Sequence, residues 1–232
     1  MRARPLLLLS LVTSFALAQS PAPPPKPTDA AAKDAASHDL GLIFGNQLRN
    51  GGLESEVSLD ALMRGIQDGL EGKPVTSQVK AHVSAVLRTG HELLGNRNKE
   101  LAREFLAKNS SGEGVTTTAS GLQYQVLSAG NANAGLAGPK DEVSVNYRGA
   151  LLDGTEFDSS YLRGQPTTFR VDAVIKGWQE ALVLMKPGAK WRLFVPPELA
   201  YDTQPPPNIP PGSMLVFDLE LLKVGPATKT AP

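Results

Sequence analysis

A phenol, a phenyl ring and a carboxylate lie close together along residues 143–160. In the first half of this stretch apolar and polar residues alternate, the pattern of a strand with one buried face, and Tyr147 falls on the apolar side. An Asp-Gly pair at 153–154 then predicts a hairpin turn, because glycine accepts the positive φ that tight turns need. Phe157 and Asp158 follow on the returning segment. These side chains form either a core in which the carboxylate is hydrogen-bonded or the wall of a pocket.

Further aromatic and aliphatic residues occur at predicted strand ends and in loops of the same half of the chain. The full set of candidate pocket residues is Tyr147, Phe157, Phe169, Val174, Ile175, Trp178, Tyr201, Ile209 and Phe217. An ordinary core position is an equal alternative for Phe169 and Phe217. Tyr201 opens a loop that contains five prolines and Ile209, and we expect this stiff loop to expose both side chains.

The C-terminal half of the sequence lacks the usual catalytic groups, since it has neither histidine nor cysteine. There is no cysteine, which excludes thiol catalysis, disulfides and thiolate metal sites. The three histidines all precede residue 92, isolated on predicted helices, so we expect neither a metal nor a cofactor. No G-x-S-x-G elbow and no phosphate-binding loop is present. A hydrolase is therefore poorly supported.

Composition narrows the function classes further. Hydrophobic residues make up 41% of the 232 residues and charged residues 20%, as in an ordinary globular protein. The formal net charge is zero, whereas a nucleic-acid-binding protein needs clustered basic residues to neutralise phosphates. We therefore expect no nucleic-acid partner.

The N-terminus has the pattern of a secretory signal peptide. Arg2 and Arg4 precede an apolar run at 6–17, and Ala16-Leu17-Ala18 fits a cleavage site. A signal anchor is the alternative, although the run is short for a membrane-spanning helix. Cleavage after Ala18 would leave 21 basic and 23 acidic residues. The sequence predicts an exported protein of the periplasm or the outer cell surface.

A leader segment and three helices are expected before the sheet. Residues 19–36 are rich in proline and alanine and predict a disordered leader. Helices are predicted over 40–50, from Ser58 to about residue 71, and over 77–108. Three amphipathic helices make a thin core, so we expect residues 37–112 to pair with a second copy as a homodimer. A helical spacer that packs only on itself is the alternative.

From residue 121 the pattern changes to the period-2 alternation of strands. Strands are predicted around 122–126, 143–151, 167–171, 191–195 and 215–221, with one short helix around 175–185. The fold class is α+β: residues 113–225 form an antiparallel sheet curled over one short helix, preceded by an all-α domain with a long linking helix. Residues 226–232 form a tail.

Four motifs in this half resemble those of FKBP-type peptidyl-prolyl cis-trans isomerases. They are V-S-V-N-Y-R-G-A-L-L-D-G-T-E-F-D-S-S, V-I-K-G-W, P-P-E-L-A-Y and L-V-F-D-L-E-L, in the family's order and at its intervals. The helical half is similar to the dimerisation module of the macrophage-infectivity-potentiator type. The resemblance implies an exported, dimeric isomerase that acts on proline-containing unfolded or nascent polypeptides.

The resemblance also implies roles for the candidate residues. Trp178 would lie under the proline ring, and Tyr147, Phe157, Phe169, Val174, Ile175 and Phe217 would surround it. The Ile175 amide and the Tyr201 hydroxyl would hold substrate carbonyls. Asp158 would orient Tyr147 or polarise the twisted amide, a turn-capping acid being the alternative. Ile209 would close the loop side.

Two positions depart from the family pattern. Asp202 replaces the glycine that often follows the loop tyrosine. A backbone with positive φ costs aspartate more energy than it costs glycine. Thr167 replaces a common aromatic residue and would open one side of the pocket, which bears on how strongly a macrolide inhibitor would bind. The rival function is a non-catalytic chaperone or surface binding module that uses the same cavity and the helices.

Overall fold

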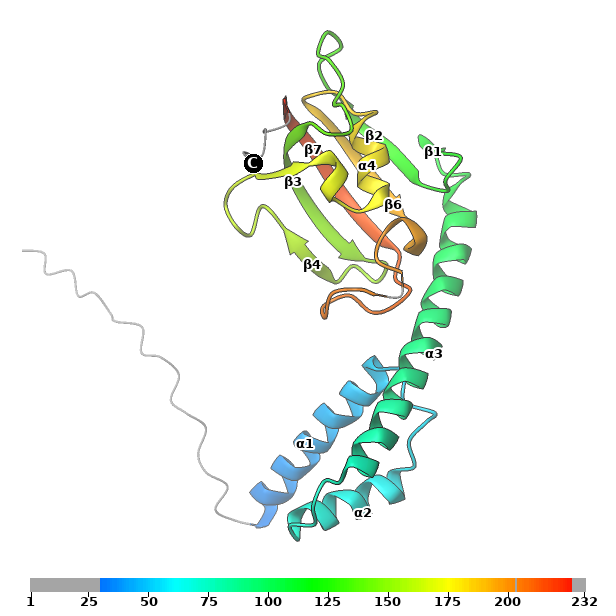
Figure 1. Cartoon of the computed structure of the whole chain (residues 1–232), viewed down its shortest axis with the longest axis vertical. Coiled ribbons are helices and arrows are strands. Elements are labelled where there is room, and N and C mark those ends of the chain that lie inside the picture. The colour runs from blue at the N-terminus through cyan, green and yellow to red at the C-terminus, as the bar shows by residue number, and fades with distance from the viewer. Residues whose placement is uncertain (1–29, 203, 227–232) are drawn as a thin grey trace, which may run out of the picture. The chain divides into compact units, whose positions relative to one another are not determined.

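The computed structural model describes residues 30–202 and 204–226, shown as ribbons in Figure 1. Two compact units are present, one ending at Ile43 and the other beginning at Phe44. The predicted signal peptide and most of the predicted tail lie outside the described residues. No helix in the described part of the chain is both long enough and apolar enough to cross a membrane.

Three helices precede the sheet: α1 (Ala30–Asn50), α2 (Leu59–Leu70) and α3 (Ser77–Asn109). Side-chain oxygens cap two of them, since Ser58 accepts from the Ala61 amide and Thr76 accepts from the Val79 amide. The boundaries of α2 and α3 match the predicted ones closely.

Helix α1 corrects one prediction. It begins at Ala30, whereas residues 19–36 were predicted to be a disordered leader and the helix to start near residue 40. The prolines of the leader end at Pro27, and the alanine-rich residues that follow have the highest helix propensity of any residue type. The proline content of the early leader therefore says little about residues 30–36.

The C-terminal half is a single antiparallel sheet with the order β1-β2-β6-β7-β3-β4, in which β5 also pairs with β3. Its strands are β1 (Val115–Thr117), β2 (Gln123–Ala129), β3 (Glu142–Leu151), β4 (Glu156–Ser159), β5 (Thr167–Arg170), β6 (Ala189–Val195) and β7 (Leu215–Gly225). Short 3-10 turns lie at Val171–Ala173 and Pro197–Leu199. Strand β1 was not predicted, because it falls in a segment rich in serine, glycine and threonine.

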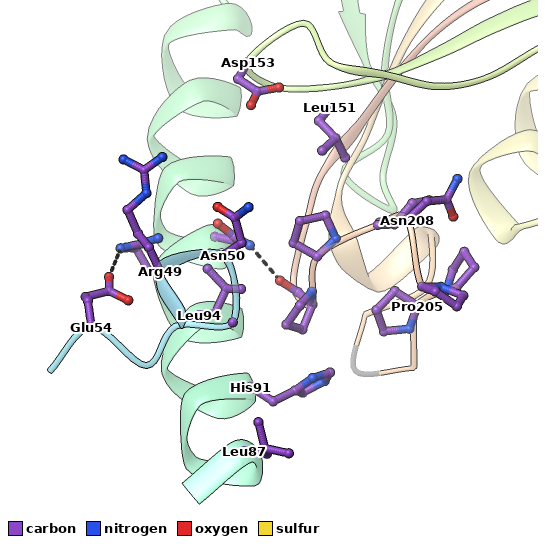
Figure 2. A pocket seen from close by; sticks show the side chains of 18 residues that line it. Arg49, Asn50, Glu54, Leu87, His91, Leu94, Leu151, Asp153, Pro205 and Asn208 are labelled. Atoms are coloured by element: carbon purple, nitrogen blue, oxygen red, sulfur yellow. Dashed lines mark hydrogen bonds and ion pairs between the residues drawn. The ribbon is translucent and has the colours of Figure 1, made fainter. Parts of the chain in front are cut away.

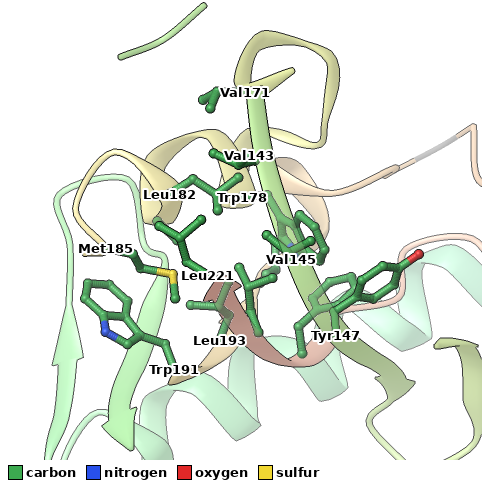
Figure 3. Packing of buried hydrophobic residues seen from close by; sticks show 14 of the residues in the cluster. Val143, Val145, Tyr147, Val171, Trp178, Leu182, Met185, Trp191, Leu193 and Leu221 are labelled. Atoms are coloured by element: carbon green, nitrogen blue, oxygen red, sulfur yellow. The ribbon is translucent and has the colours of Figure 1, made fainter. Parts of the chain in front are cut away.

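One face of the sheet packs against helix α4 (Lys176–Leu182). Burial alternates along β3 and β7, so every second side chain points at the helix, as the period-2 pattern predicted. Figure 3 shows Trp178 and Leu182 of α4 against Val143 and Val145 of β3. This layer is the main core, and its open end forms the site described below.

The C-terminal part of α3 packs against part of the other face of the sheet. Ala102 is buried there in a small cluster with Phe194 and Met214, and Phe105 packs against it. Polar contacts reinforce the attachment: the Gln123 side chain donates to the Leu106 carbonyl at 2.8 Å and accepts from Asn109 at 2.9 Å. The end of the long helix is therefore fixed to the sheet.

Candidate active site

An apolar pocket of about 410 Å³ opens at the end of the core between α4 and the sheet. Nine of the ten candidate residues line it, together with Ala173: Tyr147, Phe157, Asp158, Phe169, Val174, Ile175, Trp178, Tyr201 and Phe217. Distant segments of the chain contribute them, from β3 to β7. The sheet and α4 thus bring together nearly the whole predicted set.

Trp178 is the centre of the pocket. Tyr147, Phe169 and Phe217 each stand nearly perpendicular to its indole, at centroid distances of 5.1, 5.8 and 5.1 Å. Phe157 in turn meets Phe217 edge to face at 5.6 Å. Such arrangements suit the ring quadrupoles and hold the rings in fixed orientations. The indole is 4% exposed, and its N–H has no acceptor among the described residues.

Gly149 on β3 allows two of these rings to come close to the strand. A methyl group at this position would lie 2.7 Å from Phe157 and 2.8 Å from Phe217. A Cβ atom essentially never lies this close to a non-bonded atom, so any larger residue would push one or both rings away. The glycine in the Arg-Gly-Ala segment of β3 is therefore part of what shapes the pocket.

A polar network borders the aromatic rings. The Tyr147 hydroxyl donates to one oxygen of Asp158 at 2.5 Å, and Arg163 donates to the other oxygen at 2.5 Å. Arg163 also donates to the Tyr147 hydroxyl at 2.7 Å and to the Thr167 hydroxyl at 3.2 Å, and lies over the Tyr147 ring. Both oxygens of Asp158 are thus engaged by protein groups.

Sequence reasoning missed Arg163. It lies in the loop between β4 and β5, outside any periodic pattern, and the one available signal was a basic residue five positions after Asp158. Its contact with Thr167 also bears on the predicted opening at that position, because the guanidinium occupies part of the space beside the threonine.

The network fixes the protonation states of its members. Burial, together with the hydrogen bond to Asp158, raises the pKa of Tyr147 to about 12. Burial alone would raise the pKa of Asp158, but hydrogen bonds from Tyr147 and Arg163 outweigh it and lower the pKa. Burial, and then the charge of Asp158, raises the pKa of Tyr201. At neutral pH the acid is ionised and both phenols are protonated.

Besides the indole N–H of Trp178, two donors at the pocket have no protein acceptor among the described residues. One is the amide of Ile175, the residue before the first turn of α4, whose own carbonyl accepts from Trp178 and Gln179. The other is the hydroxyl of Tyr201, whose side chain lines the pocket and is 39% exposed. Both are therefore available to a bound molecule.

Ile209 does not belong to this pocket, and its predicted exposure is wrong. It is 4% exposed and lines a different cavity of about 1000 Å³. Figure 2 shows that cavity with Leu87 and Leu94 of α3 on one side and Pro205 and Asn208 on the other. Ile209 packs into the main core cluster of the sheet and α4, which buries the isoleucine that a free-standing loop would expose.

Comparison with known proteins identifies the family. Residues 135–222 match the model of FKBP-type peptidyl-prolyl cis-trans isomerases, and residues 33–126 match that of the domain amino-terminal to them. The isomerase FkpA of Escherichia coli K12 is 40% identical over 228 residues, which cover 88% of this chain and 83% of FkpA. The chain belongs to the FKBP-type peptidyl-prolyl cis-trans isomerase family.

Other similarities agree with this family assignment. The crystal structure of E. coli FkpA superposes with a TM-score of 0.64 at 38% identity and covers 86% of this chain and 99% of that one. The outer membrane protein MIP of Legionella longbeachae is 36% identical over 203 residues, 83% of this chain and 85% of that protein. This FKBP-type protein is therefore a peptidyl-prolyl isomerase, and the predicted activity and α+β fold are confirmed.

Proposed function

We propose that the X-Pro bond of the substrate rotates in the pocket around Trp178. The proline ring lies on the indole, between Tyr147, Phe157 and Phe217. The observation that carries this assignment is the enclosure of the indole by three perpendicular rings beside two donors that have no protein acceptor. A pyrrolidine ring is apolar and flat enough to pack on an aromatic face, and its carbonyl neighbours need donors.

The reaction requires no nucleophile. An X-Pro bond rotates over a barrier of about 18–20 kcal/mol, because rotation destroys the amide resonance. The planar amide is the more charge-separated form and the twisted amide the less polar one. An apolar pocket consequently disfavours the planar form relative to the twisted one. A thousandfold acceleration requires only about 4 kcal/mol, within reach of desolvation, shape and two hydrogen bonds.

The polar groups have separate roles in this proposal. The Ile175 amide and the Tyr201 hydroxyl donate to substrate carbonyls and fix the chain on either side of the proline. Asp158 orients Tyr147 rather than polarising the amide, because Tyr147 and Arg163 already engage both carboxylate oxygens. The apolar walls also suit a macrolide inhibitor, which would compete with the peptide for the space over Trp178.

The assignment is tested with a short X-Pro peptide whose cis and trans forms are resolved by NMR exchange. The wild-type protein accelerates the exchange, and the double variant Phe157→Ala/Asp158→Ala loses the acceleration while its circular dichroism stays native. Unchanged exchange rates with the double variant would place the reaction elsewhere in the protein.

A homodimer is the second part of the proposal, supported by an uncovered apolar face on α2. Leu59, Met63, Ile66 and Leu70 follow helical spacing, all four are exposed, and no residue of α2 is buried. Unpartnered apolar faces of this kind are typical of interaction surfaces. Light scattering of the full chain should give twice the chain mass, and Met63→Glu/Ile66→Glu should halve it. A monomeric wild-type protein would refute the dimer.

We further propose that the protein is exported and assists the folding of exported polypeptides. The basic start, apolar run and Ala-Leu-Ala segment support export, as does the name of the Legionella relative. Two pockets in one dimer would raise the affinity for a client with several prolines through effective concentration. Fractionation of cells that express the full chain tests export, since the processed protein should leave the cytoplasm.

A further inference from the structure

The loop that carries Tyr201 is attached to α3 at both ends. It runs from the 3-10 turn at Pro197–Leu199 to β7, and Asp202 lies near its start, with Gly212 near its end. These two residues are joined to each other, because the Gly212 amide donates to the Asp202 carbonyl at 2.9 Å. The base of the loop is therefore closed, and it faces the long helix.

Three residues on one face of α3 contact this base. The Lys99 ammonium lies 2.5 Å from a carboxylate oxygen of Asp202. The Asn98 side chain donates to the Pro211 carbonyl at 2.8 Å, a bond drawn dashed in Figure 2. A methyl group at Gly212 would lie 2.2 Å from the Gly95 carbonyl oxygen, so backbone meets backbone there. Positions 95, 98 and 99 are neighbours on a helix surface.

Asp202 has the backbone conformation that this attachment requires. Its φ of 44° is the one positive value among non-glycine residues of the described chain, and its amide donates to the Pro197 carbonyl at 3.1 Å. Aspartate adopts this conformation at a cost that glycine avoids, but only aspartate offers a carboxylate to Lys99. The carboxylate oxygen next to Lys99 has no other partner among the described residues.

Tyr201 depends on this loop for its position. Its hydroxyl has no protein hydrogen-bond partner among the described residues, so no hydrogen bond of its own fixes the hydroxyl in the pocket. We propose that Lys99 and Asp202 are positioning residues, which tie the loop to α3 and thereby place the Tyr201 hydroxyl against the substrate. This inference rests on the role proposed above for Tyr201.

The test measures kcat/KM for an X-Pro peptide in full-length variants. Lys99→Met removes the charge and keeps a side chain of similar length, whereas Lys99→Arg keeps the charge. Asp202→Asn removes the carboxylate charge and still tolerates a positive φ. We expect Lys99→Met and Asp202→Asn each to lower kcat/KM about threefold to tenfold, the range typical of indirect coupling. Lys99→Arg should restore at least half of the wild-type value.

A matched control lies on the same helix. Arg103 forms an exposed ion pair with Glu100 at 2.5 Å, and no hydrogen bond or ion pair joins either residue to the described part of the loop, so Arg103→Met should leave kcat/KM unchanged. Amide hydrogen exchange adds a structural measurement, because the Gly212 amide should exchange faster in Lys99→Met than in Arg103→Met. Exposed ion pairs contribute little to global stability, so the melting temperatures of the two variants should stay close.

Combination with Tyr201→Phe separates the two proposals. If the ion pair acts through the Tyr201 hydroxyl, Lys99→Met lowers kcat/KM no further in the Tyr201→Phe background. Wild-type activity of Lys99→Met, or an equal loss with and without the hydroxyl, would overturn the positioning role. Wild-type activity of Tyr201→Phe itself would overturn the role proposed for that tyrosine.

Discussion

The two tryptophans of this protein share one core and have different surroundings. Trp178 and Trp191 are almost equally buried, at 4% and 7% exposure. Trp178 is met by the edges of three rings, which leave a cavity beside it. Trp191 stacks face to face on Tyr124 at 4.2 Å and 11°, and Met185 lies beside it in Figure 3.

The difference shows how the orientation of neighbouring rings determines whether the faces of a buried tryptophan are covered. A stacked pair covers ring faces with protein and contributes to stability through close packing. Perpendicular rings contact one another at their edges and leave space between them for a flat apolar ligand. Burial alone would not distinguish the two residues, whereas the orientation of their neighbours does.

The largest expected effect comes from replacing each tryptophan by leucine. Trp178→Leu should lower kcat/KM for an X-Pro peptide about 30-fold or more, equivalent to about 2 kcal/mol of transition-state stabilisation, because the surface under the proline is lost. Trp191→Leu should cost about 2–3 kcal/mol of unfolding free energy and leave kcat/KM of the folded protein within about twofold. Peptide kinetics and urea denaturation measure the two quantities.

An activity loss of similar size in both variants would break the comparison. It would mean that the stacked tryptophan also supports the pocket, and that the two ends of the core are not independent.

Gly149→Ala sharpens the comparison by moving the rings without removing one. The added methyl group must displace Phe157 or Phe217, so we expect kcat/KM to fall about tenfold, together with a loss of about 1–3 kcal/mol of stability from overpacking. Gly135→Ala is the control, because nothing lies within 4 Å of the added methyl group. Equal activity of the two variants would show that the ring positions matter little.

Two of the Arg–Asp ion pairs in the C-terminal half allow a similar test of charge. Asp158 is paired with Arg163 at the pocket, and Asp218 is paired with Arg192 across β6 and β7. Asp158→Asn should lower kcat/KM about fivefold, because Tyr147 loses its charged acceptor. Asp218→Asn should stay within about twofold, since the pair lies away from the pocket. Equal kinetics for both would make Asp158 a structural acid only.

The smallest effect concerns pH. The folded pKa of Asp158 is lowered, so its stabilising contribution is complete above the ordinary aspartate pKa of about 3.9 and is lost as pH falls through the lower folded value. The folded pKa of Tyr147 is raised to about 12, so its contribution is complete below about pH 10 and is lost toward 12. We expect kcat/KM to be flat between about pH 5 and 9. A step inside that range would require another titrating group.

Most of the pocket could be predicted from sequence, and the exceptions have physical causes. The alternation of apolar and polar residues along β3 and β7 indicates which side chains face α4. It therefore predicts that Tyr147 and Phe217 lie on the same face of the sheet. Arg163 was missed because it lies in an irregular loop, where no period predicts direction. Ile209 was misplaced because its burial depends on the main core of the sheet and α4, whose residues are distant from it in the sequence. Such long-range contacts leave no local pattern.

The perpendicular packing around Trp178 also makes this residue an intrinsic fluorescent probe of the pocket. The chain contains only two tryptophans, and one of them is fixed in a permanent stack with Tyr124. A guest that enters the pocket changes the surroundings of Trp178 alone, so any change in intrinsic fluorescence on titration reports occupancy without a dye or label. The emission of Trp191 supplies a constant background within the same molecule.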